Sequence, residues 1–323
     1  MKRRDMIRKT ALGAAGLSMG TGILHAKETV VIPRTPKPQP REMAYHPLGK
    51  TGITVSLLGF GSHLNEENLK DPKCRDRQIQ EAIENGVTLF DIYDHSVYHQ
   101  FKPMARSLEG KRRKVVISLV AVEPDVRKEV EGALRTFNTD SIDLYRIVYR
   151  DADGYTKGDG DLDLLFRMKE EGKIRAVGVV AHDEAGVLYA AENKPVDYIM
   201  MPLNFHRNMA WFDDKPDTYS RVIPLCREKG IGILGIKPMG GDQMVAFAQY
   251  AGFLSPGYRG PSYPKAALRY LWRNRDLASS LPSINTVGEL YDALDSIWRP
   301  EFTKEDAEVL KKLSKSADKT LGK

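Results

Sequence analysis

The sequence is short of the residues that build several common kinds of site and scaffold. Two cysteines, Cys74 and Cys226, are too few for a zinc ribbon, an iron–sulfur cluster or a disulfide framework. Their spacing leaves open whether they pair or remain buried thiols. No G-x-G-x-x-G motif follows any strand-like segment, which argues against an open dinucleotide-binding sheet. No uncharged apolar run reaches the 18 residues that a membrane-spanning helix needs.

The positive charge of the chain is concentrated at its start. Five Lys or Arg residues and one acid give residues 1–26 a charge of +4, which leaves only +2 of the net +6 for the rest. This nearly balanced remainder predicts no nucleic-acid-binding face. The composition, 41% apolar and 28% charged, is that of an ordinary globular protein with one large domain or two small ones.

Residues 1–26 have the layout of an export signal. Arg3 and Arg4 precede the mildly apolar, uncharged segment 11–24, and Ala26 is a small residue suited to cleavage. The segment resembles a twin-arginine (Tat) signal peptide, with a disordered basic N-terminus as the alternative. It predicts transit through the Tat export machinery, a periplasmic or otherwise exported location and no stable membrane span in the mature form. Whether the signal is cleaved stays open.

The prolines and the apolar runs predict a linker followed by one barrel domain. Residues 27–42 contain four prolines, which favour an extended linker. Within residues 43–323, eight short apolar runs alternate with helix-like segments, which predicts an α/β fold, a (β/α)8 TIM barrel. The predicted strands are 55–60, 88–91, 115–120, 142–148, 176–180, 198–203, 232–236 and 279–282.

Several strand segments, in this order, resemble the aldo-keto reductase family. Residues 45–61 resemble its N-terminal hairpin and first strand, and residues 230–241, GIGILGIKPMGG, resemble its seventh strand. Segments 85–91, 141–145 and 172–179 match its second, fourth and fifth strands. The resemblance covers residues 44 to about 297. It implies carbonyl reduction with NADPH by a tyrosine acid, a lysine, a histidine and an aspartate.

The residues at the expected catalytic positions depart from that set. Asp91 stands where the family has its aspartate, but Ser96 occupies the tyrosine position, flanked by Tyr93 and Tyr98. Ser-Leu-Val at 118–120 replaces the lysine at the end of the third strand. The histidine at the end of the fourth strand is replaced by Ile-Val-Tyr at 147–149.

The segment 91–99, DIYDHSVYH, is the densest polar cluster at a strand end. Two acids, two histidines and two tyrosines at a barrel mouth indicate a site, although a solvated loop is the alternative. Helical spacing of Asp91, His95 and His99 would suit a metal, but a strand end leads first into a loop, so no metal site is predicted. The candidate catalytic residues are Asp91, Tyr93, His95 and Tyr98.

NAD or NADP is the cofactor that the resemblance implies. The Ser-Asn pair that holds the nicotinamide amide in the family reads Val180-Ala181 here, and the stacking aromatic reads Ile236. The basic residues near the last strand are replaced by 283–286 and Glu289, which weakens the argument for NADP. The remaining candidate contacts are Asn204, Lys237, Gly240, Gly241 and Asn285.

Other residues are expected at the same mouth. Strand alternation places Arg146, Val148 and Arg150 on one face, so an inward arginine either supplies the missing cation or forms a buried ion pair. Histidines after three strands, and aromatic residues in two long loops, are candidates for ligand contact. They are His63, His182, His206, Trp211, Phe212, Tyr258 and Tyr263, together with Arg259.

These features favour an exported oxidoreductase that uses NAD or NADP on a small-molecule carbonyl or alcohol substrate. A non-catalytic barrel that binds a ligand or a partner is the alternative, and a metal-dependent hydrolase or isomerase is the third. Retention of a nicotinamide cofactor by the purified protein separates the first from the others.

The paired arginines generate the first testable prediction. We expect that changing Arg3 and Arg4 together to Lys leaves the precursor in the cytoplasm, because a Tat signal depends on both arginines. Fractionation and immunoblotting of the double mutant measure this. Normal export of the double mutant would contradict the Tat assignment.

Overall fold

The computed structural model describes residues 42–62, 72–92, 101–149, 157–206, 220–255 and 257–321. The predicted signal peptide, and the predicted linker apart from its last residue, lie outside this part of the chain.

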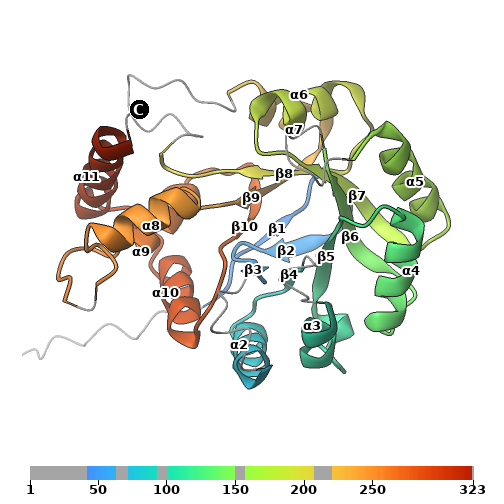
Figure 1. Ribbon diagram of the computed structural model, residues 1–323, viewed down its shortest axis with the longest axis horizontal. Helices are drawn as coiled ribbons and strands as arrows, with labels where there is room; N and C mark the ends of the chain where they lie inside the picture. Colours follow the sequence, from blue (N-terminus) through green and yellow to red (C-terminus); the bar gives the residue numbers. More distant parts are fainter. Residues whose placement is uncertain are drawn as a thin grey trace, which may run out of the picture. The chain divides into compact units, whose positions relative to one another are not determined.

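Eight parallel strands form the predicted barrel (Figure 1). Each strand pairs with the next along the chain, and the sheet closes where Leu58 bridges Ser280 and Gly61 bridges Ser283. This arrangement confirms the (β/α)8 TIM barrel. The strands are β3 (Phe60–Gly61), β4 (Leu89–Ile92), β5 (Val116–Ala121), β6 (Ile142–Val148), β7 (Ile174–Val180), β8 (Tyr198–Pro202), β9 (Gly232–Ile236) and β10 (Leu277–Leu281).

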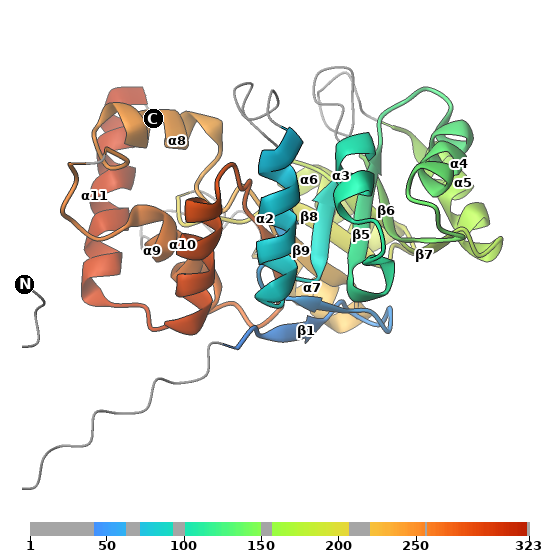
Figure 2. The ribbon, with the colours of Figure 1, turned by 90° about the horizontal axis from the view of Figure 1, so that it is seen from below.

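A short antiparallel hairpin covers the end of the barrel where the strands begin (Figure 2). It consists of β1 (Tyr45–Pro47) and β2 (Thr54–Ser56). Leu48, Ile53 and Val55 from this hairpin are buried against the residues inside the barrel. Gly232 admits Leu48, because a Cβ at that position would lie 2.5 Å from the Leu48 Cδ1.

One predicted strand boundary is wrong. The segment 55–60 was expected as a single first barrel strand, but its start belongs to hairpin strand β2 and only Phe60 belongs to β3. The apolar run is continuous because both halves are buried, one against the barrel floor and one within the barrel wall. Hydrophobicity alone therefore does not show where the chain changes direction.

The alternation of side chains along each strand separates two cores. Inward residues such as Leu89, Leu144 and Leu234 fill the barrel, while outward residues pack against the surrounding helices. Tyr198 is a bulky inward side chain, and its ring lies over Gly178 of the adjacent strand, where a Cβ would come within 2.4 Å of it. Glycine at this position therefore makes room for a ring in the barrel interior.

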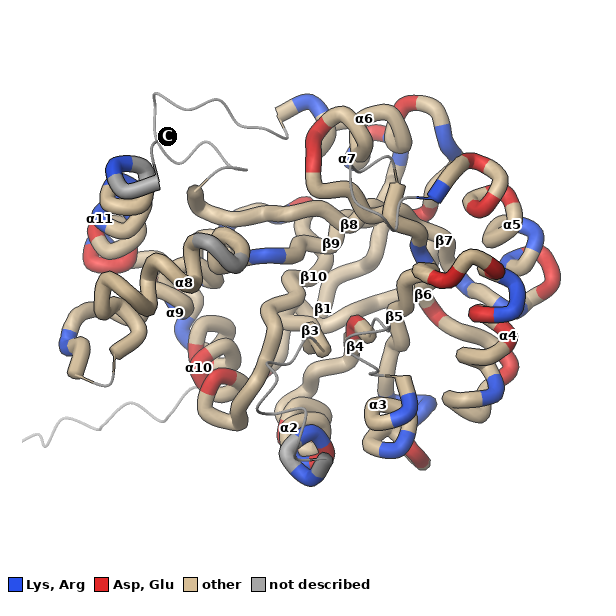
Figure 3. The backbone as a smooth tube through the Cα atoms, in the orientation of Figure 1, with Lys and Arg blue, Asp and Glu red and all other residues tan. Residues whose placement is uncertain are grey.

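The helices cover the outer face of the barrel, and Figure 3 shows Lys, Arg, Asp and Glu lying mostly on them with both signs interspersed. Asp183 and Thr286 cap α6 and α10, because their side chains accept from the N–H groups of Gly186 and Glu289. The sequence did not predict three of the helices, which are α3, α8 and α11. The helices are α2 (Pro72–Glu84), α3 (Phe101–Ser107), α4 (Val126–Thr136), α5 (Asp159–Glu170), α6 (Glu184–Asn193), α7 (Val222–Lys229), α8 (Asp242–Tyr250), α9 (Tyr263–Leu271), α10 (Val287–Trp298) and α11 (Lys304–Leu321).

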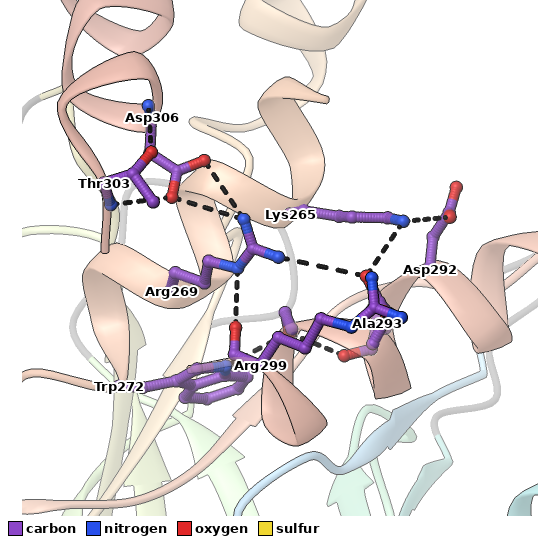
Figure 4. Close-up of polar contacts among 10 residues, drawn as sticks. Lys265, Arg269, Trp272, Asp292, Ala293, Arg299, Thr303 and Asp306 are labelled. Atoms are coloured by element: carbon purple, nitrogen blue, oxygen red, sulfur yellow. Dashed lines mark hydrogen bonds and ion pairs between the residues drawn. The ribbon is translucent and has the colours of Figure 1, made fainter. Parts of the chain in front are cut away.

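Polar contacts hold α11 against the barrel (Figure 4). Arg269 of α9 donates to Asp306 of α11 at 3.2 Å and to the Arg299 carbonyl at 2.8 Å. Thr303 and Asp306 cap the start of α11 reciprocally, through their side chains and backbone N–H groups. The C-terminal helix is thus part of the barrel domain. None of the helices that the structure describes is long and apolar enough to cross a membrane.

Candidate active site

The carboxyl ends of the strands surround a cavity of about 790 Å³. Asp91, Val148 and Ile236 all line it, as expected for residues at one mouth of a parallel barrel. Every barrel strand contributes to its floor. The contributing residues are Gly61, Asp91, Val120, Arg146, Val148, Val180, Met200, Ile236 and Leu281.

A buried ion pair lies at the floor of this cavity. Arg146 of β6 holds the Asp91 carboxylate of β4 in a bidentate contact, with N–O distances of 2.6 and 3.1 Å. The side chains are almost fully buried, since Asp91 is 6% exposed and Arg146 4%. Ser118 of the intervening strand β5 donates to Asp91 at 2.7 Å and accepts from Arg146 at 2.9 Å. Three adjacent strands therefore build one charged cluster.

Strand geometry explains why these three residues meet. Asp91 pairs in register with Ser118, and Arg146 pairs with Val120, two residues further along the same inward face of β5. Arg146 points inward, as alternation predicts, and its charge is taken up by Asp91. Of the two interpretations offered by the sequence, the buried ion pair is therefore present, and the same guanidinium is also the cation at the cavity floor.

Tyr198 lies beneath this pair in the barrel interior. Its phenol is fully buried, and burial raises its pKa, with the Arg146 charge acting in the opposite direction. Tyr198 does not line the cavity, and its buried hydroxyl has no hydrogen-bond partner among the described residues.

The candidate cofactor residues divide into two groups. Lys237, Gly241 and Asn285 line the cavity, and Gly240 adjoins Gly241. Lys237 adopts a left-handed backbone with φ of 53°, and Gly240 and Gly241 have φ of 90° and 84°, which turns the chain directly into α8. Asn204 lies elsewhere: its side chain accepts from the His206 N–H at 3.0 Å and does not line the cavity.

The start of α8 borders the cavity. Its N-cap residue, Gly241, has no side chain to cap the first N–H groups, and a Cβ at Gly241 would meet only the Lys237 side chain, at 3.7 Å. A helix N-terminus with free N–H groups attracts anions. In barrels of this class, phosphate groups bind at such a short helix after the seventh or eighth strand, which here are β9 and β10.

The remaining predicted residues have varied positions. His182 and Tyr263 line the cavity, whereas His206 is buried and its Nδ1 lies 2.6 Å from the Ser314 hydroxyl. Tyr258 and Arg259 are described but do not line it. Tyr93, His95 and Tyr98 lie outside the described residues, as do His63, His99, Arg150, Trp211 and Phe212.

Two further observations concern metals and thiols. Within the residues that the structure describes, no group of three His, Cys, Asp or Glu side chains could hold a metal ion. Cys226 is a buried free thiol whose pKa burial raises to about 12, so it suits a structural role.

Glu129 of α4 holds the loop that follows β5 at the cavity rim. Its carboxylate accepts from the N–H groups of Val122 and Glu123, at 3.0 and 2.9 Å, and Val122 lines the cavity. Burial raises the pKa of Glu129 to about 7, although these hydrogen bonds and the charge of Lys157 oppose the shift. The rim of the site therefore depends on a carboxyl group that titrates near neutrality.

Sequence reasoning missed Ser118 as a partner of Asp91, and it missed Asp292 on the cavity wall. Ser118 was noted only as a position without lysine. The alternation of inward residues along 116–120 was a signal for its orientation, but its partner lies on another strand. Asp292 lies on a helix face that the sequence pattern marks simply as polar.

The comparisons with known proteins agree with this geometry. Residues 57–249 match the Aldo/keto reductase family. The chain belongs to this family. The solved aldo-keto reductase AKR11C1 from Bacillus halodurans, in its holo form, superposes with a TM-score of 0.65 at 19% identity, over 84% of this chain and 96% of that one. The likeness supports the fold of this aldo/keto reductase.

Two sequence relatives are oxidoreductases by name. The chain is 25% identical over 227 residues to the uncharacterized oxidoreductase YrpG from Bacillus subtilis (strain 168), covering 62% of this chain and 67% of the relative. It is 22% identical over 303 residues to L-galactose dehydrogenase from Arabidopsis thaliana, covering 81% and 91%. An oxidoreductase activity is the function class that these similarities support.

The buried pair generates a stability prediction. We expect Arg146→Met to lower the free energy of unfolding by about 3–5 kcal/mol, because it leaves the Asp91 carboxylate buried without its cation. The double mutant Asp91→Asn with Arg146→Met should recover part of that loss. Urea unfolding followed by circular dichroism measures both.

Arg175→Met is the matched control for this prediction. Arg175 pairs with the buried Asp143, but its side chain is half exposed and Asp143 keeps Arg112 at 2.8 Å. Its replacement should cost about 1 kcal/mol or less. Equal losses for Arg146→Met and Arg175→Met would contradict the view that the Asp91 carboxylate depends on Arg146, whereas Asp143 keeps a second arginine when Arg175 is replaced.

Glu129 generates a pH prediction. Because its folded pKa is raised above the usual 4.5, the folded state holds a proton that the unfolded state releases, so stability falls as pH rises from about 4.5 to about 7. Glu129→Gln should remove this dependence. Relative to the wild type, its free energy of unfolding should rise across that window by up to roughly 2–3 kcal/mol. Urea unfolding at pH 4.5, 6 and 7.5 measures the difference, and a constant difference would contradict it.

Proposed function

We propose that this chain is an exported aldo/keto reductase that binds NAD or NADP and transfers a hydride to or from one narrow class of small carbonyl or alcohol substrates. The observation that carries the proposal is the continuity of one cavity. It joins a charged floor, formed by Asp91 and Arg146, to the N-terminus of α8 beside Lys237.

The residues of the cavity fit a dinucleotide. Its volume lies within the range of about 300–1,000 Å³ that ligand sites occupy. The first turn of α8, Gly241 and Lys237 suit the pyrophosphate, because backbone N–H groups and a cation meet there at a residue without a side chain. When bound, the nicotinamide supplies the hydride acceptor or donor.

The floor of the cavity can orient and polarise a substrate oxygen. The Arg146 guanidinium carries only N–H donors, so we assign it to hydrogen bonding with a carbonyl oxygen and not to proton transfer. The proton then comes from another group. Tyr93, Tyr98 and His95 follow Asp91 closely in the chain, and we assign the donor to this segment.

The apolar wall around the floor restricts the substrate. Val120, Val148, Val180 and Met200 border Arg146 and leave little polar surface for a sugar-like or charged group close to the reacting atom. Burial of such a group without partners is unfavourable. The substrate should therefore present one polar oxygen to the floor and an apolar body to the wall.

Export is part of the same proposal. The paired arginines support a Tat route, which carries folded proteins and so permits a cofactor to be bound before export. The mature protein would then act in the periplasm or an equivalent exported location.

The second candidate is a barrel that binds a ligand but has lost hydride chemistry. Ser118 at the position expected for lysine, and the engagement of Arg146 by Asp91, favour it. The two candidates differ in turnover, since a ligand-binding barrel oxidises and reduces nothing.

Binding of a dinucleotide tests the proposed function. We expect the mature protein to bind NADH or NADPH in a fluorescence titration, and Lys237→Met to weaken that binding about tenfold, because it removes the cation at the pyrophosphate site. Lys102→Met on α3 is the matched control and should leave the affinity unchanged.

Turnover separates the two candidates. The site should reduce a panel of generic aldehydes poorly, since loss of general acid assistance is worth about 10²–10⁴-fold. Activity on its own substrate should fall with Asp91→Asn and with Tyr93→Phe or Tyr98→Phe. Absence of dinucleotide binding, or rapid generic turnover that survives both tyrosine substitutions, would contradict the proposal.

A further inference from the structure

An uncharged and exposed segment borders the cavity on the side of α8. Residues 243–258, which are most of α8 and the turn that follows it, contain no Lys, Arg, Asp or Glu. Tyr250 at the end of α8 is 88% exposed, and Leu254 in the turn is 40% exposed. Leu254 also lines the cavity, so this exposed apolar surface reaches the cavity rim.

Tyr250 differs from the other exposed tyrosines that the structure describes as large apolar surface. Tyr45 donates to the Gly86 carbonyl at 3.0 Å, and Tyr291 donates to the Glu81 carboxylate at 2.6 Å. Tyr250 forms no hydrogen bond with any residue in the described part of the chain. Its ring and its hydroxyl are therefore both available to a partner that is apolar in one layer and polar in the next.

Lysines of α11 lie beside this segment. The Nζ of Lys312 lies 5.9 Å from the centre of the Phe253 ring, and Phe253 precedes Leu254 in the chain. Figure 2 shows α8 and the C-terminal part of α11 at the end of the barrel opposite the hairpin of β1 and β2. The exposed lysines in this part of α11 are Lys311, Lys312, Lys315 and Lys319.

The chain does not neutralise these four lysines. None of them forms an ion pair with a residue that the structure describes. Asp318 is the only acid of residues 309–321, and Asp242 is the only acid of α8. Together with Tyr250 and Leu254, the four lysines form the α8–α11 face, which has an uncharged centre and a net positive border.

This combination decides which kind of partner fits the face. An anionic lipid surface accepts aromatic and aliphatic side chains in its headgroup layer, and its phosphates attract clustered lysines. A second copy of the chain fits less well, because a two-fold contact through the same face would bring the lysines of both copies together. The charge of the face therefore favours lipid over self-association.

We propose that the α8–α11 face docks the protein on a bilayer that contains anionic phospholipid. Tyr250 and Leu254 enter the headgroup layer, and the lysines of α11 lie on the lipid phosphates. The cavity rim then lies at the membrane surface, because Leu254 belongs both to this face and to the cavity lining. The inference goes beyond the proposed function and does not depend on which reaction the cavity performs.

Co-sedimentation of the mature protein with lipid vesicles tests the inference without relying on turnover. The mature form is used because the basic leader, residues 1–26, would itself bind anionic lipid. We expect binding to vesicles of phosphatidylcholine and phosphatidylglycerol in equal parts, and little binding to phosphatidylcholine alone. Salt at about 1 M, where the Debye length is about 3 Å, should release the protein.

Two sets of substitutions test the two parts of the face separately. Lys312→Gln combined with Lys315→Gln should weaken binding to the anionic vesicles by about fivefold for each lysine removed. Tyr250→Ser combined with Leu254→Ser should weaken it at least about fivefold and leave its dependence on salt, since the lysines remain. Thermal unfolding verifies that each variant folds.

Lys102→Gln combined with Lys114→Gln is the matched control. It removes the same charge from two exposed lysines at and just after α3, which Figure 1 shows apart from α8 and α11. This control should leave vesicle binding unchanged. Binding to neither kind of vesicle, equal binding to both, or weakening by the α11 pair no greater than by the control would overturn the inference.

Sedimentation velocity without lipid tests the alternative occupant of the face. We expect the same sedimentation coefficient for the wild type and for Tyr250→Ser, because the face is not an interface between copies. A dimer that Tyr250→Ser dissociates would assign the face to a second copy of the chain and overturn the inference. Dinucleotide binding is measured separately, so each of these results leaves the proposed function standing.

Discussion

Closure of the sheet between β3 and β10 is the constraint on which the rest of the structure depends. Two glycines permit it: a Cβ at Gly59 would lie 2.4 Å from the Leu281 side chain, and one at Gly61 would lie 2.6 Å from the Pro282 carbonyl oxygen. The close approach lets the Gly59 N–H bond the Ser280 carbonyl at 2.8 Å. Because the sheet closes, all strand ends meet at one mouth, and one cavity receives a residue from every strand.

Electrostatics within the closed barrel follow from its exclusion of water. A carboxylate at the position of Asp91 is costly to bury alone, and Arg146 and Ser118 supply the charge and the hydrogen bonds that compensate it. The same pair puts a guanidinium group at the cavity floor. Stability and the proposed chemistry are therefore coupled there, since Arg146, which compensates the buried charge of Asp91, is also the residue that we propose meets a substrate oxygen.

Much of the barrel was predictable because strands and helices leave local patterns. Strands β6 and β9 begin and end where the apolar runs predict. The short helix α8 was missed because Gly240 and Gly241 resemble a loop, although their positive φ angles serve to start a helix. The first strand was misjudged because burial on both sides of Gly59 hides the change from hairpin to barrel wall.

The sequence by itself determined the order of strands and helices, the inward face of each strand and the residue types at each strand end. These properties depend on local periodicity and on the φ angles that single residues permit. Only the tertiary structure decided that Arg146 meets Asp91 across 55 residues, that Asn204 lies outside the cavity and that the starts of α8 and α10 both border it. Such contacts depend on the register of neighbouring strands and on which helix ends meet at the mouth, and distance along the chain carries no information about either.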